Sequence, residues 1–358
     1  MLCFQHMLKY AKIKQQVLAK LPSLLPTVRV GKIEVDKKIS GQTFDLVFKV
    51  ETENQQEWLL VCEINELLQP RIAREVSSQI KEKIATLNKV YPVLVTSFLG
   101  TRTREILKRE GVGYVDLAAN CYLKFNNVYI EKIVDKNPFV EKRKLKTIFK
   151  PISSRILRVL LENTKKNWKI LELSKSGGVS LGQTSNVCRW LIDEEYLRKN
   201  QEGFYFLTEP GKLLDEWCQN YTYTQNKVFT YYSFEKNLEK LTKKINSLSE
   251  DKELKYALTL LSGASLVAPF IRGVSSLQMY ISNSEDIPNW IRLLELRPVE
   301  SGSNISIYIP YDEGVFYKLQ EVNGIRIVGN IQLYLDLYNY PARGREQAEF
   351  LRREKIKF

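Results

Sequence analysis

The stretch that most constrains the fold is residues 178–191, GVSLGQTSNVCRWL. Its first residue, Gly178, follows Gly177, so the stretch begins at a pair of glycines. Such a pair interrupts a helix. Ser180 is suited to cap the next helix, because its hydroxyl oxygen accepts a backbone N–H that the first helical turn leaves unpaired. From Ser180 onward, mostly apolar residues recur at spacings of three and four, which predicts one buried face. That face comprises Thr184, Val187, Cys188 and Leu191.

The elements around this helix predict a winged helix-turn-helix over residues 151–218. Two short helices are expected before it, at 153–163 and 169–174, and two strands around a polar turn after it, at 196–207. Pro210 then opens a further helix, since its fixed φ suits a first helical turn. The outward face of the central helix carries hydroxyls, amides and an arginine, the side chains that read base edges in a DNA major groove. The expected base contacts are Gln183, Ser185, Asn186 and Arg189, and Ser180 is expected to be a further DNA-binding residue.

Length and charge agree with a DNA-binding protein of several domains. A chain of 358 residues is too long for one ordinary hydrophobic core, so two or three domains are expected. A net charge of +13 suits a polyanion such as double-stranded DNA, although basic proteins also bind membranes or acidic proteins. Residues 138–150 are expected to be a basic linker, which serves either phosphate binding or solubility. In the first case Lys199 of the wing would act with three linker residues, Lys142, Arg143 and Lys144.

Composition also excludes several chemistries. His6 is the single histidine, so a Ser-His-Asp triad or a histidine-rich metal centre is not expected. Five scattered cysteines without CxxC spacing predict reduced thiols in the cytoplasm and argue against a zinc site. No apolar run reaches the length of a transmembrane helix, and the start has no signal-peptide cleavage site, so no membrane association is expected.

The N-terminal residues 1–137 are expected to form an α/β domain. A helix at 8–21 precedes three strands at 27–36, 43–50 and 58–64, and a long helix at 71–89 leads into a buried strand at 91–97. A helix at 101–110 and short strands at 114–117 and 120–125 follow. The order of helix, three strands, helix and strand is the core order of restriction-endonuclease-like nucleases.

That fold would hold a metal between two acids, beside a lysine that orients the attacking water and offsets charge in the transition state. Asp45 and Glu63 lie on adjacent expected strands, where their oxygens suit Mg²⁺ and a water for attack on a phosphate. The position of the lysine is held by Asn65, which carries no positive charge. The sequence therefore favours a domain that has lost catalysis, with a working nuclease as the alternative. In the first case the two carboxylates would be strand-edge groups near Arg71 or Arg74.

Residues 219–358 predict a second α/β region. Helices are expected at 234–248, 256–271, 285–294, 330–337 and 343–355, and strands at 274–281, 305–309 and 326–329. Four tyrosines in or near 218–230 can stack on bases or pack between domains, and packing is favoured. They are Tyr221, Tyr223, Tyr231 and Tyr232. No catalytic constellation is visible in this region.

Three further stretches suggest a family. They are residues 99–120 (LGTRTREILKREGVGYVDLAAN), 258–269 (LTLLSGASLVAP) and 331–349 (IQLYLDLYNYPARGREQAE). Together with the expected winged helix closed by residues 208–214, they resemble the large form of the AbiEi-like transcriptional regulators. These regulators are grouped with the antitoxins of type IV toxin–antitoxin systems. The resemblance covers most of the chain, from about residue 45 onward.

The resemblance implies a DNA-binding regulator. In the antitoxins that it resembles, a winged helix binds the promoter of the operon, and the C-terminal region neutralises a nucleotidyltransferase-like toxin without a stable complex. Independently of the resemblance, a homodimer on an inverted repeat is the usual arrangement for a helix-turn-helix protein. The extra nuclease-like domain departs from the compact antitoxins and leaves a toxin partner open. The interpretation of the sequence is thus a multidomain α/β transcriptional regulator without a cofactor. The alternative is a metal-dependent DNA nuclease that uses Asp45 and Glu63 with Mg²⁺, and a third hypothesis is an antitoxin that acts chiefly on a toxin.

Overall fold

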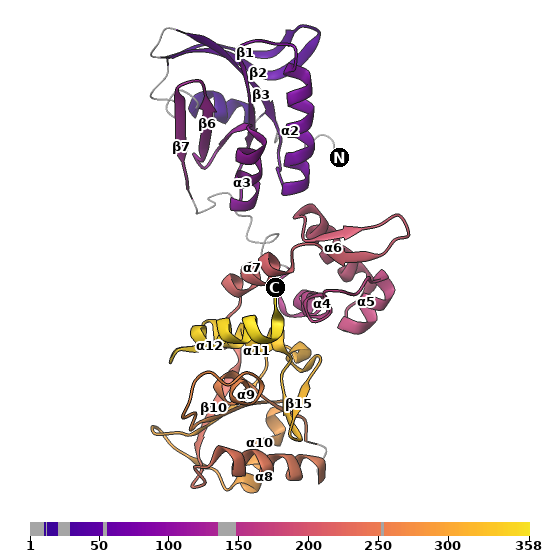
Figure 1. The fold of residues 1–358 in the computed structure, drawn as a ribbon, viewed down its shortest axis with the longest axis vertical. Coiled ribbons are helices and arrows are strands. Elements are labelled where there is room, and N and C mark those ends of the chain that lie inside the picture. The colour runs from indigo at the N-terminus through magenta and orange to yellow at the C-terminus, as the bar shows by residue number, and fades with distance from the viewer. Residues whose placement is uncertain (1–10, 12, 21–28, 53–55, 135–147, 252–253) are drawn as a thin grey trace. The chain divides into compact units, whose positions relative to one another are not determined.

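The computed structural model describes residues 11, 13–20, 29–52, 56–134, 148–251 and 254–358 (Figure 1). The chain divides into two compact units. The first comprises Met1–Arg143 with Ile192–Glu195, and the second comprises Lys144–Leu191 with Tyr196–Phe358. Each unit is a mixture of helices and sheet, as the sequence predicted. The predicted linker residues Lys142, Arg143 and Lys144 lie outside the described residues, and so does His6.

The first unit contains a seven-stranded sheet in which spatial order equals chain order. Its strands are β1 (Arg29–Ile39), β2 (Gln42–Glu51), β3 (Glu57–Ile64), β4 (Val90–Thr96), β5 (Gly113–Asp116), β6 (Cys121–Phe125) and β7 (Val128–Lys132). Strands β3, β4 and β5 are parallel, because helices connect them, and every other pair of neighbours is antiparallel. The predicted strands of this unit are present, and β7 is an addition that the sequence analysis missed.

Helices cover both faces of this sheet. Helix α2 (Pro70–Ile84) and helix α3 (Thr101–Glu110) pack through Ala73, Ile80 and Leu107 on one face, and the helical residues 13–20 pack on the other. Glycine at 111, with φ of +70°, ends α3 at the predicted position. Helix α2 ends five residues before the predicted 89, because the chain turns into β4 there.

Residues 151–207 of the second unit form three helices and a hairpin. The elements are α4 (Pro151–Leu161), α5 (Ile170–Gly177), α6 (Leu181–Asp193), β8 (Leu197–Lys199) and β9 (Tyr205–Leu207). Helix α7 (Pro210–Asn220) follows and has a proline in its first turn, as predicted. Helix α4 is buried almost all round, which marks it as the centre of this segment.

The rest of the second unit is built on another seven-stranded sheet, ordered β13-β10-β14-β12-β11-β16-β15. Its strands are β10 (Lys227–Tyr232), β11 (Tyr256–Leu258), β12 (Leu277–Ile281), β13 (Arg297–Pro298), β14 (Ile305–Ile309), β15 (Gln320–Val322) and β16 (Ile325–Ile327). Figure 1 shows helices on both sides of it. On one side are α9 (Leu260–Val267), α11 (Asn330–Tyr338) and α12 (Gly344–Leu351), and on the other are α8 (Leu238–Asp251) and α10 (Ile287–Leu294).

One expectation for this region needs correction. The predicted helix at 256–271 is wrong at its start, because Tyr256–Leu258 is strand β11 and the helix is confined to Leu260–Val267. The tyrosine-rich stretch contains strand β10. Tyr221 and Tyr231 are buried, while Tyr223 and Tyr232 are half-buried.

Candidate functional site

The entry to α6 is built as the sequence predicted. Gly178 ends α5 with a φ of +58°, a left-handed conformation that glycine adopts without strain. The Ser180 hydroxyl oxygen accepts the backbone N–H of Gln183 at 3.3 Å, and the Ser180 carbonyl accepts that of Thr184 at 2.9 Å. Ser180 therefore caps α6 and fixes where the helix begins.

Helix α6 has one buried and one outward face. Its buried residues are the four that periodicity predicted: Thr184, Val187, Cys188 and Leu191. On the opposite side, Asn186 and Arg189 are exposed and Ser185 is half-buried. These three residues and Gly182 are spaced by three, one and three, so they line one stripe of the helix. The stripe offers a hydroxyl, an amide and a guanidinium to solvent, and glycine leaves room at its start.

The structure gives Gln183 a different place from the one predicted. Its amide donates to the Ser153 hydroxyl of α4 at 2.8 Å, so the side chain joins two helices and does not lie on the outward stripe. Position 183 flanks the buried face, one residue before Thr184, and this explains the contact. Ser180, Ser185, Asn186 and Arg189 remain as the surface-facing set, all on or beside α6.

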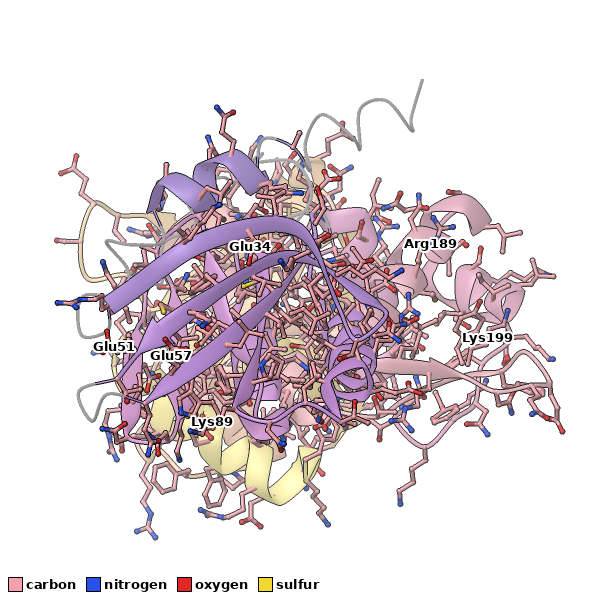
Figure 2. All side chains as sticks on the ribbon, turned by 90° about the horizontal axis from the view of Figure 1, so that it is seen from above. Glu34, Glu51, Glu57, Lys89, Arg189 and Lys199 are labelled. Carbon is pink, nitrogen blue, oxygen red and sulfur yellow. The ribbon has the colours of Figure 1, made fainter. Side chains whose placement is uncertain are left out.

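The β8–β9 hairpin supplies exposed positive charge. Arg198 and Lys199 are exposed on β8, and the Lys199 ammonium lies 5.4 Å from the centre of the Tyr205 ring on β9. Gly203, with φ of +82°, allows the tight turn between the strands. Figure 2 shows Lys199 on the hairpin and Arg189 on α6. A cationic hairpin thus accompanies the polar stripe of α6 within one segment.

The first unit places Asp45 and Glu63 side by side. Leu46 pairs with Cys62 across the antiparallel strands β2 and β3, so Asp45 and Glu63 are the next residues opposite each other, on one face of the sheet. Asp45 accepts the backbone N–H of Ile64 at 2.6 Å. Burial and the neighbouring Asp45 raise the pKa of Glu63, because two close carboxylates disfavour double ionisation.

The cation at this carboxylate pair is Lys83, which the sequence analysis missed. The Lys83 ammonium of α2 donates to the Glu63 carboxylate at 2.6 Å. The expectation of Arg71 or Arg74 at this place is wrong, since Arg74 bonds Glu110 and Glu195 and Arg71 bonds Asp193. Both arginines lie near the start of α2, whereas its end reaches the carboxylates. A lysine twenty residues from its partner leaves no local signal in a sequence.

Asn65 follows the pair at the end of β3, where its backbone N–H donates to the Val95 carbonyl at 2.8 Å. Among the described residues, no group of three or more histidine, cysteine or acidic side chains is placed to hold a metal ion. Two carboxylates still fit Mg²⁺, which in proteins keeps several waters and takes one or two carboxylates.

The four cysteines of the described chain, Cys62, Cys121, Cys188 and Cys218, are buried and unpaired, as expected for reduced thiols.

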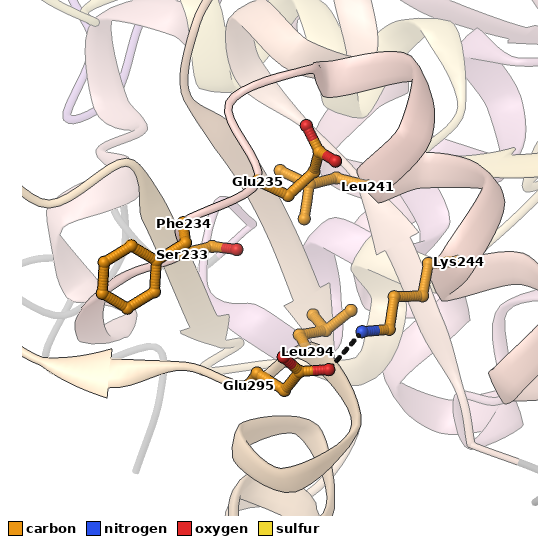
Figure 3. A pocket seen from close by; sticks show the side chains of 7 residues that line it. All are labelled: Ser233, Phe234, Glu235, Leu241, Lys244, Leu294 and Glu295. Atoms are coloured by element: carbon orange, nitrogen blue, oxygen red, sulfur yellow. Dashed lines mark hydrogen bonds and ion pairs between the residues drawn. The ribbon is translucent and has the colours of Figure 1, made fainter.

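A small hollow lies between the α8 and α10 elements of the second unit (Figure 3). Its wall includes Phe234 and an ion pair in which the Lys244 ammonium donates to Glu295 at 3.0 Å. The hollow measures about 60 Å³, which is room for about two water molecules. It is too small for a nucleotide or a cofactor.

Similarity to known proteins bears on the second unit. The chain is a mixed α/β protein in which a segment of three helices and a hairpin precedes a helix-covered sheet. Residues 207–357 match the model of the AbiEi_2 family, described as transcriptional regulator, AbiEi antitoxin, type IV TA system. Over these residues, the match confirms the resemblance seen in the sequence.

Other comparisons add little. The apo structure of EndoMS is similar at 15% identity over 30% of this chain and 45% of that chain, with a TM-score of 0.22. The chain thus spans less than half the length of that solved protein. No curated protein matches the sequence. In the described part of the chain, every helix is too short or too polar to cross a lipid bilayer.

Proposed function

We propose that this protein is a DNA-binding transcriptional regulator that reads DNA with a winged helix, residues 151–218. The observation that supports the proposal most is the outward stripe of α6, capped by Ser180 and accompanied by a cationic hairpin. Helix α6 would enter the major groove and β8–β9 would be the wing. The family of residues 207–357, a family of transcriptional regulators, supports the same function.

The residues divide into two roles. Ser185, Asn186 and Arg189 would meet base edges, since amides favour adenine and arginine favours guanine. Ser180 and Lys199 would contact phosphates, joined by the linker residues Lys142, Arg143 and Lys144. Phosphate contacts position the protein and base contacts specify the site. In this proposal, Gln183 supports α6 through Ser153 and makes no base contact.

The protein would act in the cytoplasm as a homodimer on an inverted repeat, the usual arrangement for helix-turn-helix proteins. As a type IV antitoxin it would also counteract a cognate toxin through function rather than a stable complex. Co-expression with a neighbouring toxin gene tests this part, and growth that is not rescued would exclude it.

A genome-wide recovery of DNA bound to the protein tests the central claim. A regulator is expected to occupy one promoter or a few promoters, and these should include its own. Uniform occupancy would indicate a nonspecific DNA-binding protein. Absence of bound DNA would contradict the proposed function altogether.

Lys199→Ala is expected to weaken binding about equally for all DNA sequences. Removal of one phosphate contact should lower the slope of log affinity against log salt by roughly one. Titration of labelled duplexes at several salt concentrations measures both quantities. Lys240→Ala, which alters an exposed lysine on α8, is the matched control and should leave affinity and slope unchanged. An unchanged slope for Lys199→Ala would remove the hairpin from the interface.

A second candidate function is a metal-dependent DNA nuclease in the first unit, which would have a restriction-endonuclease-like fold. The observation that favours it is Lys83, which brings to Glu63 the positive charge that Asn65 lacks. Asp45 and Glu63 would hold Mg²⁺, which supplies an activated water when bound. Lys83 would offset negative charge at a phosphate. The ion pair equally suits a structural role, in which Lys83 neutralises the carboxylates.

Incubation of the protein with plasmid DNA and Mg²⁺ or Mn²⁺ separates these two functions. As a regulator without catalysis, the protein is expected to leave the plasmid intact. Cleavage that disappears in Asp45→Ala, Glu63→Ala and Lys83→Met would establish the nuclease instead. Glu57→Gln is the control, since it alters an exposed carboxylate of the same strand β3 that is paired with Lys49.

A further inference from the structure

Helix α4 carries a second polar face, on the side of the helix opposite Ser153. Arg155, Arg158 and Glu162 are spaced by three and four, so they lie on one side of α4 and its C-cap. Each of them bonds to the stretch 312–332, more than 150 residues further along the chain. We call these three residues the α4 ridge.

The first ridge contact is a fork-shaped ion pair. The Arg155 Nε and Nη2 atoms donate to the Asp312 carboxylate at distances of 2.7–2.9 Å. Asp312 is buried, and its Oδ1 also accepts the backbone N–H of Gly314 at 2.8 Å. A paired arginine and carboxylate with this geometry hold two elements in one orientation.

The second contact is deeper. Arg158 is 2% exposed, and its guanidinium lies 5.1 Å from the centre of the Trp217 ring and donates to the Gln332 side-chain oxygen at 2.6 Å. The Gln332 amide in turn donates to the buried Asp336 at 2.8 Å. A buried cation and a buried anion are therefore linked through one amide of α11.

The third contact closes the end of α4. The Glu162 carboxylate accepts the backbone N–H of Ile331 at 2.9 Å, at the start of α11, and the Lys318 ammonium donates to the Glu162 carbonyl at 2.7 Å. From Arg155 to its C-cap, α4 is thus bonded to residues 312–332. On its other side, α4 bonds α6 through Ser153 and packs Ile156 against Gly177.

We infer that residues 312–336 are a platform that sets the position of α6 on DNA, and that Arg155, Arg158 and Glu162 are positioning residues for DNA recognition. The inference rests on the proposed function. Because α4 lies between α6 and the platform, a loosened ridge lets α6 move relative to the rest of the unit. Base contacts depend on sub-ångström placement, so DNA affinity falls although no DNA-contacting residue has changed.

One substitution distinguishes a positioning role from a purely electrostatic effect, because the two predict opposite changes in DNA affinity. Asp312→Asn removes a negative charge from a DNA-binding protein, and electrostatics alone predicts tighter binding to DNA. Positioning predicts the opposite, because a neutral amide at this position cannot hold Arg155 in a charged fork. Asparagine keeps the side-chain oxygen that Gly314 needs, so the local turn is preserved. Glu313→Gln removes the same charge from the next residue, whose side chain is exposed, and is the matched control.

The test uses the full chain and a DNA duplex that the wild-type protein enriches from a random-sequence pool. Asp312→Asn should bind this duplex roughly fivefold or more weakly, with an unchanged salt slope, while Glu313→Gln binds equally or more tightly. Gly314→Ala is a second variant. Its added Cβ would lie 2.5 Å from Asp312 Oδ1 and 2.7 Å from Arg158 Nη1, which forces the ridge apart, and it should weaken binding in the same way.

Thermal unfolding of each variant shows that the chain is folded at the assay temperature. Folded Asp312→Asn and Gly314→Ala that bind as tightly as the wild type, or more tightly, would overturn the inference. A reduced salt slope in Arg155→Met would show instead that Arg155 contacts phosphate directly. If the wild-type chain enriches no duplex, the proposed function fails, and this outcome is distinct from failure of the platform.

Discussion

Replacement of Arg189 by alanine is expected to weaken binding to the preferred DNA by about 1–3 kcal/mol, which is roughly a 5- to 150-fold loss of affinity. Arg189 is exposed on the outward stripe of α6, and a guanidinium there can donate two hydrogen bonds to a guanine edge. Affinity for unrelated duplexes should fall less, because those complexes rest on phosphate contacts. The variant therefore loses discrimination as well as affinity.

Competition binding with the selected duplex and a scrambled duplex measures this loss. Arg292→Ala is the control, since Arg292 is an exposed arginine on α10, a helix outside residues 151–218. It removes the same charge and should change little. If Arg189→Ala retains full affinity and discrimination while the protein still binds DNA, the assignment of α6 as the recognition helix is wrong.

Asp336→Ala is expected to lower the free energy of unfolding of the second unit by about 3–5 kcal/mol. The Asp336 carboxylate is fully buried and accepts four hydrogen bonds. The donors are Tyr221, Thr259, Tyr280 and Gln332, at distances of 2.5–3.1 Å. Alanine leaves all four donors buried without this acceptor. Unfolding by urea or heat measures the loss, and Asp336→Asn, which keeps one oxygen, should lose less.

Asp336 also predicts a pH dependence. Burial raises the pKa of this carboxyl from 3.8 to about 6, although its hydrogen bonds act in the opposite direction. The folded state therefore binds the proton more tightly than the unfolded state. This contribution to stability is fully present below about pH 4 and is lost as pH rises through about 6, by roughly 3 kcal/mol.

Comparison of the wild type with Asp336→Asn isolates that contribution, because the variant cannot titrate at this position. The difference in free energy of unfolding between the two proteins is measured at intervals from pH 4 to pH 7. As pH rises, the variant should become more stable relative to the wild type. A difference that stays constant over this range would show that Asp336 has the same pKa in both states.

Local chemistry made the candidate site partly predictable. The cap at Ser180 and the buried face of α6 depend on residues within a few turns, so spacing alone placed Thr184, Val187, Cys188 and Leu191 inside. The contact of Gln183 with Ser153 was missed because the two residues are thirty positions apart. Long-range pairs of this kind leave no periodic signal, and the bonds of Arg155 and Arg158 are more distant still.

The secondary structure was likewise predictable where it depends on nearby residues and not where it depends on distant ones. Strands bounded by turn residues, such as Ile305–Ile309, were predicted at their observed bounds. Tyr256–Leu258 was predicted as helix because a short apolar run suits a buried strand or a buried helix equally well. Its neighbours in the sheet, β12 and β16, decide the outcome, and β16 is almost seventy residues away. Glu63 was found from its strand, but its partner Lys83 depended on where α2 ends.

The burial of Arg158 between Trp217 and Gln332 limits how this protein can be retargeted. A winged helix transplanted from a relative would bring a different α4. Its side chains at positions 155, 158 and 162 would face Asp312, Gln332 and the start of α11, which fit the present residues at those positions. Such a chimera is expected to misfold or to bind weakly whatever its recognition helix reads. Changes of target sequence are best confined to positions 185, 186 and 189, which solvent reaches and the platform does not.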